Sequence, residues 1–146
     1  MFWTRKNNAM LYKEFYSELG KLLYAVADID GIITQKEKEK LQEIVRLELV
    51  PAEKRTDEFG TDLAFYSEIE FDFLDEEIGD VDSAFNSFIS FVEEHQTAFD
   101  DKMIRVCLHV ARELAAAYRG VNKKEKAIVE LLKHKLENLE LKHAHK

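Results

Sequence analysis

The chain is poor in the residues that interrupt or constrain a backbone, with one proline, five glycines and one cysteine among 146 residues. All-β folds need many turn residues, so this composition argues against them and favours long helices. The lone Cys107 cannot form a disulfide within the chain, which suits a reducing compartment. No segment approaches the ~18 apolar residues of a membrane-spanning helix, and the N-terminal residues lack the apolar stretch of a signal peptide. We therefore expect a cytoplasmic protein with no transmembrane segment.

Basic residues are missing from one long stretch. Residues 56–101 contain fifteen Asp and Glu and no Lys or Arg, so the flanks hold all 21 basic and the other 14 acidic residues. The middle has a formal charge of −15 and the flanks together +7, giving −8 for the chain. Free nucleic acid is not an expected partner, because phosphate binding needs a basic face. Either the basic flanks pack beside the acidic middle, or the middle presents a surface to cations or to a basic protein.

Apolar residues recur at helical spacing along most of the chain. The sequence is 46% hydrophobic and has ten Phe, which is enough for the core of a single domain over residues 1–146. Spacings of three and four residues predict helices over 10–28, 34–50, 63–77, 100–118 and from 122 onward, with another that Asp80 or Asp82 caps. Residues 68–73 also alternate like a strand, but no second strand is present to pair with them, so we favour a helix. The predicted class is an all-α compact bundle of about six to seven helices.

The helix predicted at 63–77 has apolar residues on two sides, and either side could face the core. We expect its core-facing residues to be Leu63, Tyr66, Ile69 and Phe73. Phe71, and Phe91 in the following helix, lie off the main stripes. They are therefore candidates for a partner-binding patch.

The two ends of the chain are similar to each other. A shift of 88 residues aligns Ile33-Thr34-x-x-Glu37 with Val121-Asn122-x-x-Glu125. Each segment has an apolar helix, a turn with glycine, a capping box and a second apolar helix. We predict two pseudo-repeated hairpins, at about 10–50 and about 102–140, on either side of the acidic middle.

Oxygen-bearing side chains gather in the turn of the first hairpin. Counted from Val26, the third, fifth, ninth and twelfth positions match a calcium-binding EF-hand loop, and they are Asp28, Asp30, Thr34 and Glu37. Val26 stands where that loop has its first carboxylate, which argues against a standard EF-hand. A looser site for Ca²⁺ or Mg²⁺ remains, since a cation would offset the carboxylates at the end of the preceding helix. Nearby lysines would offset the same charge without a metal.

In this turn the sequence resembles the tellurite-resistance TerB-like family. The shared pattern is an apolar helix ending in Ala-x-x-Asp-Gly, then a β-branched residue, a small capping residue and Glu, and residues 24–37 carry it. Residues 114–125 repeat it in part, with Tyr118-Arg119-Gly120 in place of Asp-Gly. The resemblance implies an all-α bundle with pseudo-twofold halves and a divalent cation at Asp28, Asp30 and Glu37. It also implies a non-enzymatic role in tellurite resistance or stress responses, exerted through protein partners.

Other chemistry-bearing patterns are sparse. His109 and Glu113 stand four residues apart on one predicted helix, where they either share a metal or form a surface pair. An enzyme would need a cleft that joins them to the acids of the first turn. We find no phosphate loop, nucleophile elbow, zinc spacing or dinucleotide fingerprint, so no enzyme is predicted. The alternative function is a metal-free structural or adaptor domain whose acidic middle docks a basic partner, and no oligomeric state is predicted.

Overall fold

The computed structural model describes the chain apart from residues 1, 30, 32, 97–100, 118–122 and 145–146, and apart from the side chains of 2–10, 123–125 and 139–144. Within these limits its elements are α1 (Phe2–Ala27), α2 (Gln35–Glu43), the π-helix η1 (Ile44–Leu49), α3 (Val50–Ala52), α4 (Phe65–Glu76), α5 (Val81–Glu94), α6 (Asp101–Ala116) and α7 (Lys123–Ala144). The predicted all-α bundle is confirmed, and residues 65–76 are helical. The β structure in the described part is a single bridge between Thr56 and Asp62.

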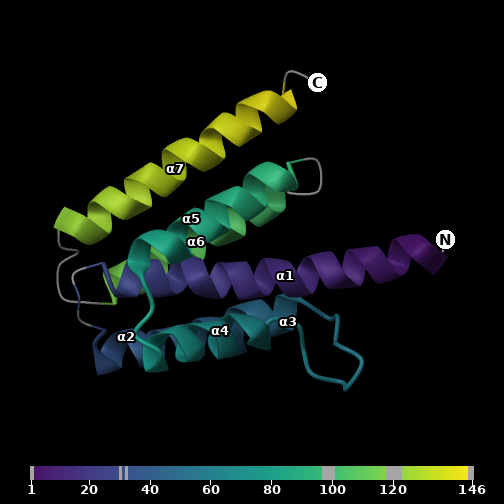
Figure 1. The fold of residues 1–146 in the computed structure, drawn as a ribbon, viewed down its shortest axis with the longest axis horizontal. Coiled ribbons are helices and arrows are strands. Elements are labelled where there is room, and N and C mark those ends of the chain that lie inside the picture. The colour runs from purple at the N-terminus through teal and green to yellow at the C-terminus, as the bar shows by residue number, and fades with distance from the viewer. Residues whose placement is uncertain (1, 30, 32, 97–100, 118–122, 145–146) are drawn as a thin grey trace.

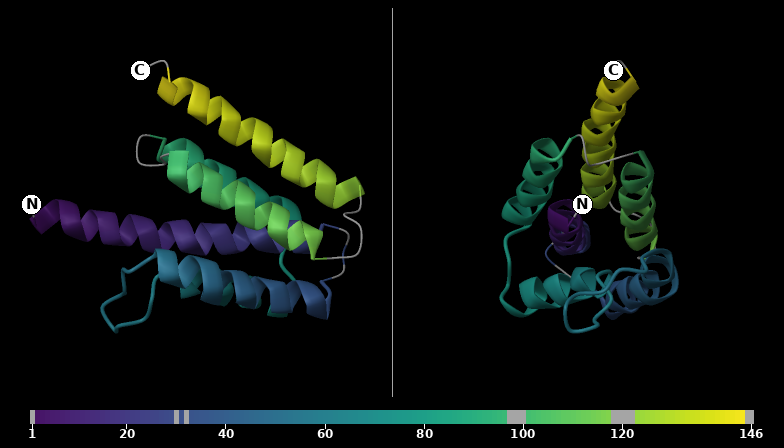
Figure 2. Two further views of the ribbon diagram at one scale, coloured as in Figure 1. Left: turned by 180° about the vertical axis from the view of Figure 1, so that it is seen from behind. Right: turned by 90° about the vertical axis from the view of Figure 1, so that its right-hand side faces the viewer.

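Helix α1 lies in the middle of the bundle (Figure 1). Seen along α1, helices α5 and α6 lie on either side of it, α7 lies above, and α2, η1 and α4 lie below (Figure 2). Six consecutive residues of α1, Leu22–Ala27, are buried. A helix that is apolar on every side needs neighbours on every side, and α1 contacts α4, α5, α6 and α7.

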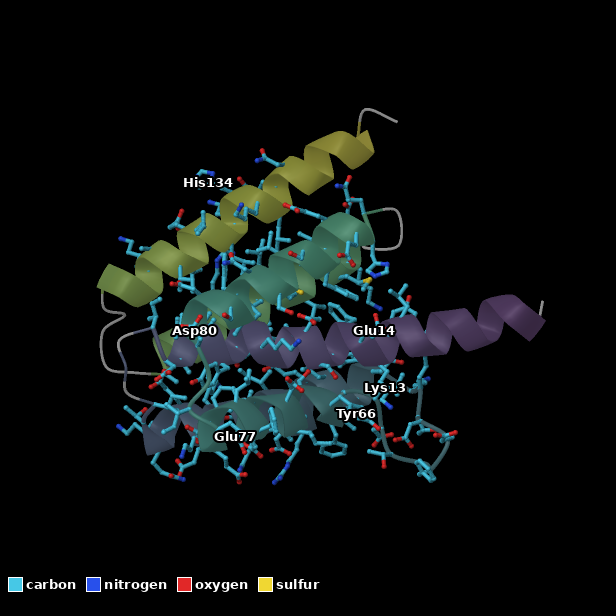
Figure 3. All side chains as sticks on the ribbon, viewed as in Figure 1. Lys13, Glu14, Tyr66, Glu77, Asp80 and His134 are labelled. Carbon is cyan, nitrogen blue, oxygen red and sulfur yellow. The ribbon has the colours of Figure 1, made fainter. Side chains whose placement is uncertain are left out.

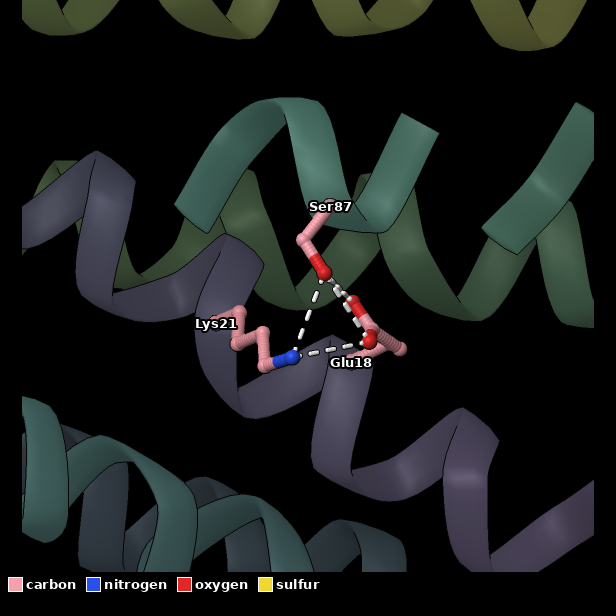
Figure 4. A network of polar contacts seen from close by, with 3 residues as sticks. All are labelled: Glu18, Lys21 and Ser87. Atoms are coloured by element: carbon pink, nitrogen blue, oxygen red, sulfur yellow. Dashed lines mark hydrogen bonds and ion pairs between the residues drawn. The ribbon is translucent and has the colours of Figure 1, made fainter. Parts of the chain in front are cut away.

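A small polar network joins α1 to α5 (Figure 4). The hydroxyl of Ser87 lies 3.0 and 2.9 Å from the two carboxylate oxygens of Glu18. The ammonium of Lys21 donates to Glu18 at 2.9 Å and to the Ser87 hydroxyl at 3.2 Å. Because all three polar groups have partners, the contact can be partly buried without a large desolvation cost.

Helices α1 and α4 approach closely at Gly20. A Cβ atom on Gly20 would lie 2.4 Å from the carbonyl oxygen of Ser67. The Ser67 hydroxyl donates a 2.8 Å hydrogen bond to the carbonyl oxygen of Tyr16, and Phe71, four residues on, is fully buried. The side of α4 that carries Ser67 and Phe71 therefore faces the core.

This orientation corrects the prediction for α4. Ile69 and Phe73, expected in the core, are 52% and 56% exposed. Phe71 and Phe91, which were candidates for a partner patch because they lie off the main stripes, are buried in the core. The physical reason is the close approach to α1, which sets the backbone of Ser67 against Gly20 and turns Ser67 and Phe71 toward the core.

Helix boundaries also differ from the prediction at Pro51. The helix expected to end there continues from α2 through η1 into α3. Asp80 caps α5 as expected, since its carboxylate accepts a hydrogen bond from the Ser83 N–H at 2.9 Å. The turn of the second predicted hairpin, with Asn122, lies outside the described residues. None of the helices described here is long and apolar enough to cross a membrane.

Candidate functional site

The first interhelical turn is held by a capping box. Thr34 is the N-cap of α2, and its hydroxyl oxygen accepts a 3.1 Å hydrogen bond from the Glu37 N–H. One carboxylate oxygen of Glu37, Oε1, accepts from the N–H and from the hydroxyl of Thr34, both at 3.0 Å. Glu37 is only 1% exposed. The predicted capping box is confirmed, and two of the four predicted ligands help to hold the start of α2.

Asp28 belongs to a contact between the end of α1 and the segment before α5. Its carboxylate accepts a 2.9 Å hydrogen bond from the Tyr24 hydroxyl, which also lies 2.8 Å from the carbonyl oxygen of Gly79. Burial and the Asp28 hydrogen bond raise the pKa of Tyr24 to about 12, so the hydroxyl keeps its proton. Asp30 lies outside the described residues, so the four-ligand site at this turn stays a prediction.

Another set of ligand-type side chains meets between η1 and α6. The Nε2 atom of His109 lies 3.0 Å from Glu48 Oε1 and 3.2 Å from Glu113 Oε2. One ligand atom from each of the three residues lies within 4.8 Å of the others. A divalent ion bound at about 2.0–2.2 Å in tetrahedral geometry holds adjacent ligand atoms about 3.3–3.6 Å apart, so the separations of 3.0 and 3.2 Å would need to widen only slightly. We call Glu48, His109 and Glu113 the His/Glu cluster.

The backbone of η1 explains how Glu48 reaches α6. The N–H of Val50 bonds to the carbonyl oxygen of Val45, five residues back, which widens the helix by comparison with an α-helix. Pro51 follows directly. It lacks an N–H for the carbonyl of Leu47, and in an α-helix its ring would clash with that carbonyl. Within η1, Ile44, Val45 and Leu49 are buried, Leu47 is exposed, and Glu48 is partly exposed beside α6.

Interactions within the cluster shift the pKa values of its two carboxyl groups in opposite directions. Burial and the hydrogen bond to Glu113 raise the pKa of Glu48. Burial alone would raise the pKa of Glu113 too, but hydrogen bonds from Lys40 and Glu48 hold it below its ordinary value. Lys40 lies 3.0 Å from the other Glu113 oxygen, Oε1. A proton or a cation is thus favoured between Glu48 and Glu113, because two adjacent carboxylates repel each other.

A groove of about 500 Å³ adjoins the cluster, and both Glu48 and His109 line it. Its volume lies within the range of small-molecule pockets. Most of the lining side chains are apolar or aromatic and come from α1, η1 and α6. Its buried acid, Glu53, accepts hydrogen bonds from the Tyr16 hydroxyl at 3.1 Å and from the Arg55 guanidinium at 3.0 and 3.1 Å. The groove therefore gives the cluster an open side with a mainly apolar floor.

Sequence reasoning found two members of the cluster and missed the third. His109 and Glu113 are visible as a pair one helical turn apart. Glu48 is 61 residues from His109, and no periodicity links them. The available signal was Pro51, three residues after Glu48, which disturbs the helical register there. Within the described residues, His109 and Glu113 form this cluster with Glu48.

Comparisons with protein-family models, with curated proteins and with solved structures found no match for this chain. The resemblance to the TerB-like family rests on residues 24–37 and their partial repeat, and it stays a prediction.

Proposed function

We propose that this chain is a non-enzymatic helical domain that binds one divalent cation at Glu48, His109 and Glu113 and acts through protein partners. The observation that carries the proposal is the convergence of two carboxylates and one imidazole, from two separate helices, at distances that suit a single ion.

The ligand types favour zinc over the Ca²⁺ or Mg²⁺ expected at the first turn. Calcium and magnesium prefer oxygen ligands, whereas imidazole with carboxylate is a usual ligand set for Zn²⁺. Three protein ligands leave a fourth position open. The cluster borders the groove, so a side chain of a partner protein could supply that ligand.

The cellular setting belongs to the same proposal. Cys107 is buried, and burial raises the pKa of its thiol, so it acts as an inert apolar residue of the core. A free core thiol suits a cytoplasmic protein. The TerB-like resemblance adds a role in tellurite resistance or another stress response, in which the cation-loaded domain contacts its partners.

Calorimetry of metal-stripped protein tests the site. The two tail histidines, His143 and His145, are first replaced by glutamine so that they cannot bind zinc themselves. We expect this background protein to bind one Zn²⁺ and the further change His109→Ala to weaken binding at least tenfold. The matched control is His134→Ala on α7, at the upper edge of the bundle (Figure 3). Zinc binding that is absent, or equal in the His109 and His134 variants, would overturn the proposal.

Calcium and magnesium titrations followed by amide NMR test the first-turn prediction separately. Saturable shifts centred on Gly31 that Asp28→Ala removes would place a further cation at that turn. Their absence up to millimolar metal would leave the His/Glu cluster as the proposed site and dismiss the first turn.

A further inference from the structure

Helix α4 keeps two large apolar side chains in solvent. Ile69 and Phe73 are 52% and 56% exposed. They stand four residues apart, so they lie one above the other on the same side of the helix. The opposite side is anchored on α1 through Ser67 and Phe71. The exposed apolar pair therefore lies on the side of α4 that faces away from α1.

Acidic side chains surround this pair. Asp72 and Glu76 follow Ile69 by three and seven residues, on the same helical stripe, and both are exposed. The four residues Ile69, Asp72, Phe73 and Glu76 form what we call the α4 face. Glu77 follows directly and lies on the lower side of the bundle (Figure 3). Residues 65–80 include no Lys or Arg.

Two ion pairs within the described residues neutralise neighbouring acids of α4. Lys38 pairs with Asp75 at 3.0 Å and Arg46 with Glu68 at 3.4 Å. Among the residues that the structure describes, no Lys or Arg forms an ion pair with Asp72 or Glu76. Burial and the charges of neighbouring carboxylates, Glu68 foremost, raise the pKa of Asp72. The α4 face thus joins an exposed apolar pair to a negative charge that a cation would relieve.

We infer that the α4 face docks a basic amphipathic helix of a partner protein. Apolar side chains on one face of that helix would cover Ile69 and Phe73, and flanking Lys or Arg would reach Asp72 and Glu76. Charge complementarity selects this occupant. Nucleic acid, anionic lipid and acidic peptides are repelled, and so is a second α4 face carrying the same charges. The surface is separate from the His/Glu cluster and needs no cation there.

A synthetic probe tests the surface. The probe is a fluorescein-labelled 18-residue helix with leucine on one face and lysine on the other. A scrambled peptide of the same composition has no continuous leucine face. Anisotropy titrations run in EDTA, so a failure of the cation proposal does not affect them. We expect the ordered peptide to bind more tightly than the scrambled one, to lose affinity as salt rises, and to shift amide signals of residues 68–77.

Matched variants separate apolar contact from charge. Ile69→Ser with Phe73→Ser should weaken binding at least tenfold. Asp72→Asn with Glu76→Gln should weaken it and reduce its salt dependence. Glu93→Gln with Glu94→Gln removes the same charge from exposed positions on α5 and should leave affinity unchanged. All six positions are exposed, so the variants should keep the helical circular dichroism of the parent.

Three results would overturn the inference. The ordered peptide does not bind, or the scrambled peptide binds equally well, or the Ile69/Phe73 variant binds like the parent.

Discussion

A single methyl group at Gly20 should loosen the bundle. In Gly20→Ala the new Cβ would lie 2.4 Å from the Ser67 carbonyl oxygen and 3.0 Å from the Glu70 Cβ. The nearest atom belongs to the backbone of α4, so relief requires α4 to move away from α1. Overpacking of this kind costs about 1–3 kcal/mol, and a clash with backbone belongs at the upper end. Alanine regains about 1 kcal/mol as the better helix former. The net expectation is a loss of roughly 2 kcal/mol.

Urea denaturation followed by circular dichroism measures this loss, and a thermal scan should show a fall in Tm of about 6 °C. The free-energy difference between Glu14→Gly and Glu14→Ala, at an exposed position of α1, is the control for the Gly-to-Ala helix propensity alone. Ser67→Gly should not rescue Gly20→Ala, because the clash is with the carbonyl oxygen and not with the serine side chain. A Gly20→Ala protein as stable as the parent, or more stable, would refute the close approach of α1 and α4.

Two further expectations concern the capping box and the His/Glu cluster. Thr34→Ala should lower the free energy of unfolding, measured by urea denaturation, by about 1 kcal/mol, because it removes the acceptor for the Glu37 N–H. An equal loss with and without EDTA would assign Thr34 to helix capping. A loss seen only with metal would contradict this assignment. The raised pKa of Glu48 means that the folded state disfavours its ionised form. The contribution of Glu48 to the free energy of unfolding is therefore fully present below the pKa of Glu48 in the unfolded chain. That contribution is lost as the pH rises through the raised pKa of the folded state. Glu48→Gln should remove that dependence from a series of urea curves between pH 3 and 8, and an unchanged series would contradict it.

Much of the fold could be predicted because its signals are local. The spacing of apolar residues predicted the helices, and the pair Thr34 and Glu37, three residues apart, predicted a capping box. The orientation of α4 could not be read in this way. Both its stripe with Ile69 and its stripe with Phe71 are apolar, and the choice depends on Gly20 of another helix.

Two of the three residues of the candidate site could be predicted from the sequence, and the third could not for a related reason. His109 and Glu113 share one helical face, so their spacing reveals the pair. Glu48 lies in a π-helix, where side chains point in other directions than in an α-helix. It also meets His109 and Glu113 from a distant part of the chain. Periodicity describes one regular helix at a time, so it cannot supply either of these.

The central place of α1 has a consequence for how the chain is made. Helix α1 leaves the ribosome before α4, α5, α6 and α7, the helices that pack against it. Six consecutive apolar residues, Leu22–Ala27, then have no face that can be left in water. During translation this segment stays exposed until the helices that bury it have been synthesised. Exposed apolar segments of this kind lead nascent chains to aggregate or to bind chaperones. Its contacts span long stretches of sequence, so the chain should fold more slowly than a bundle of the same size built from successive hairpins.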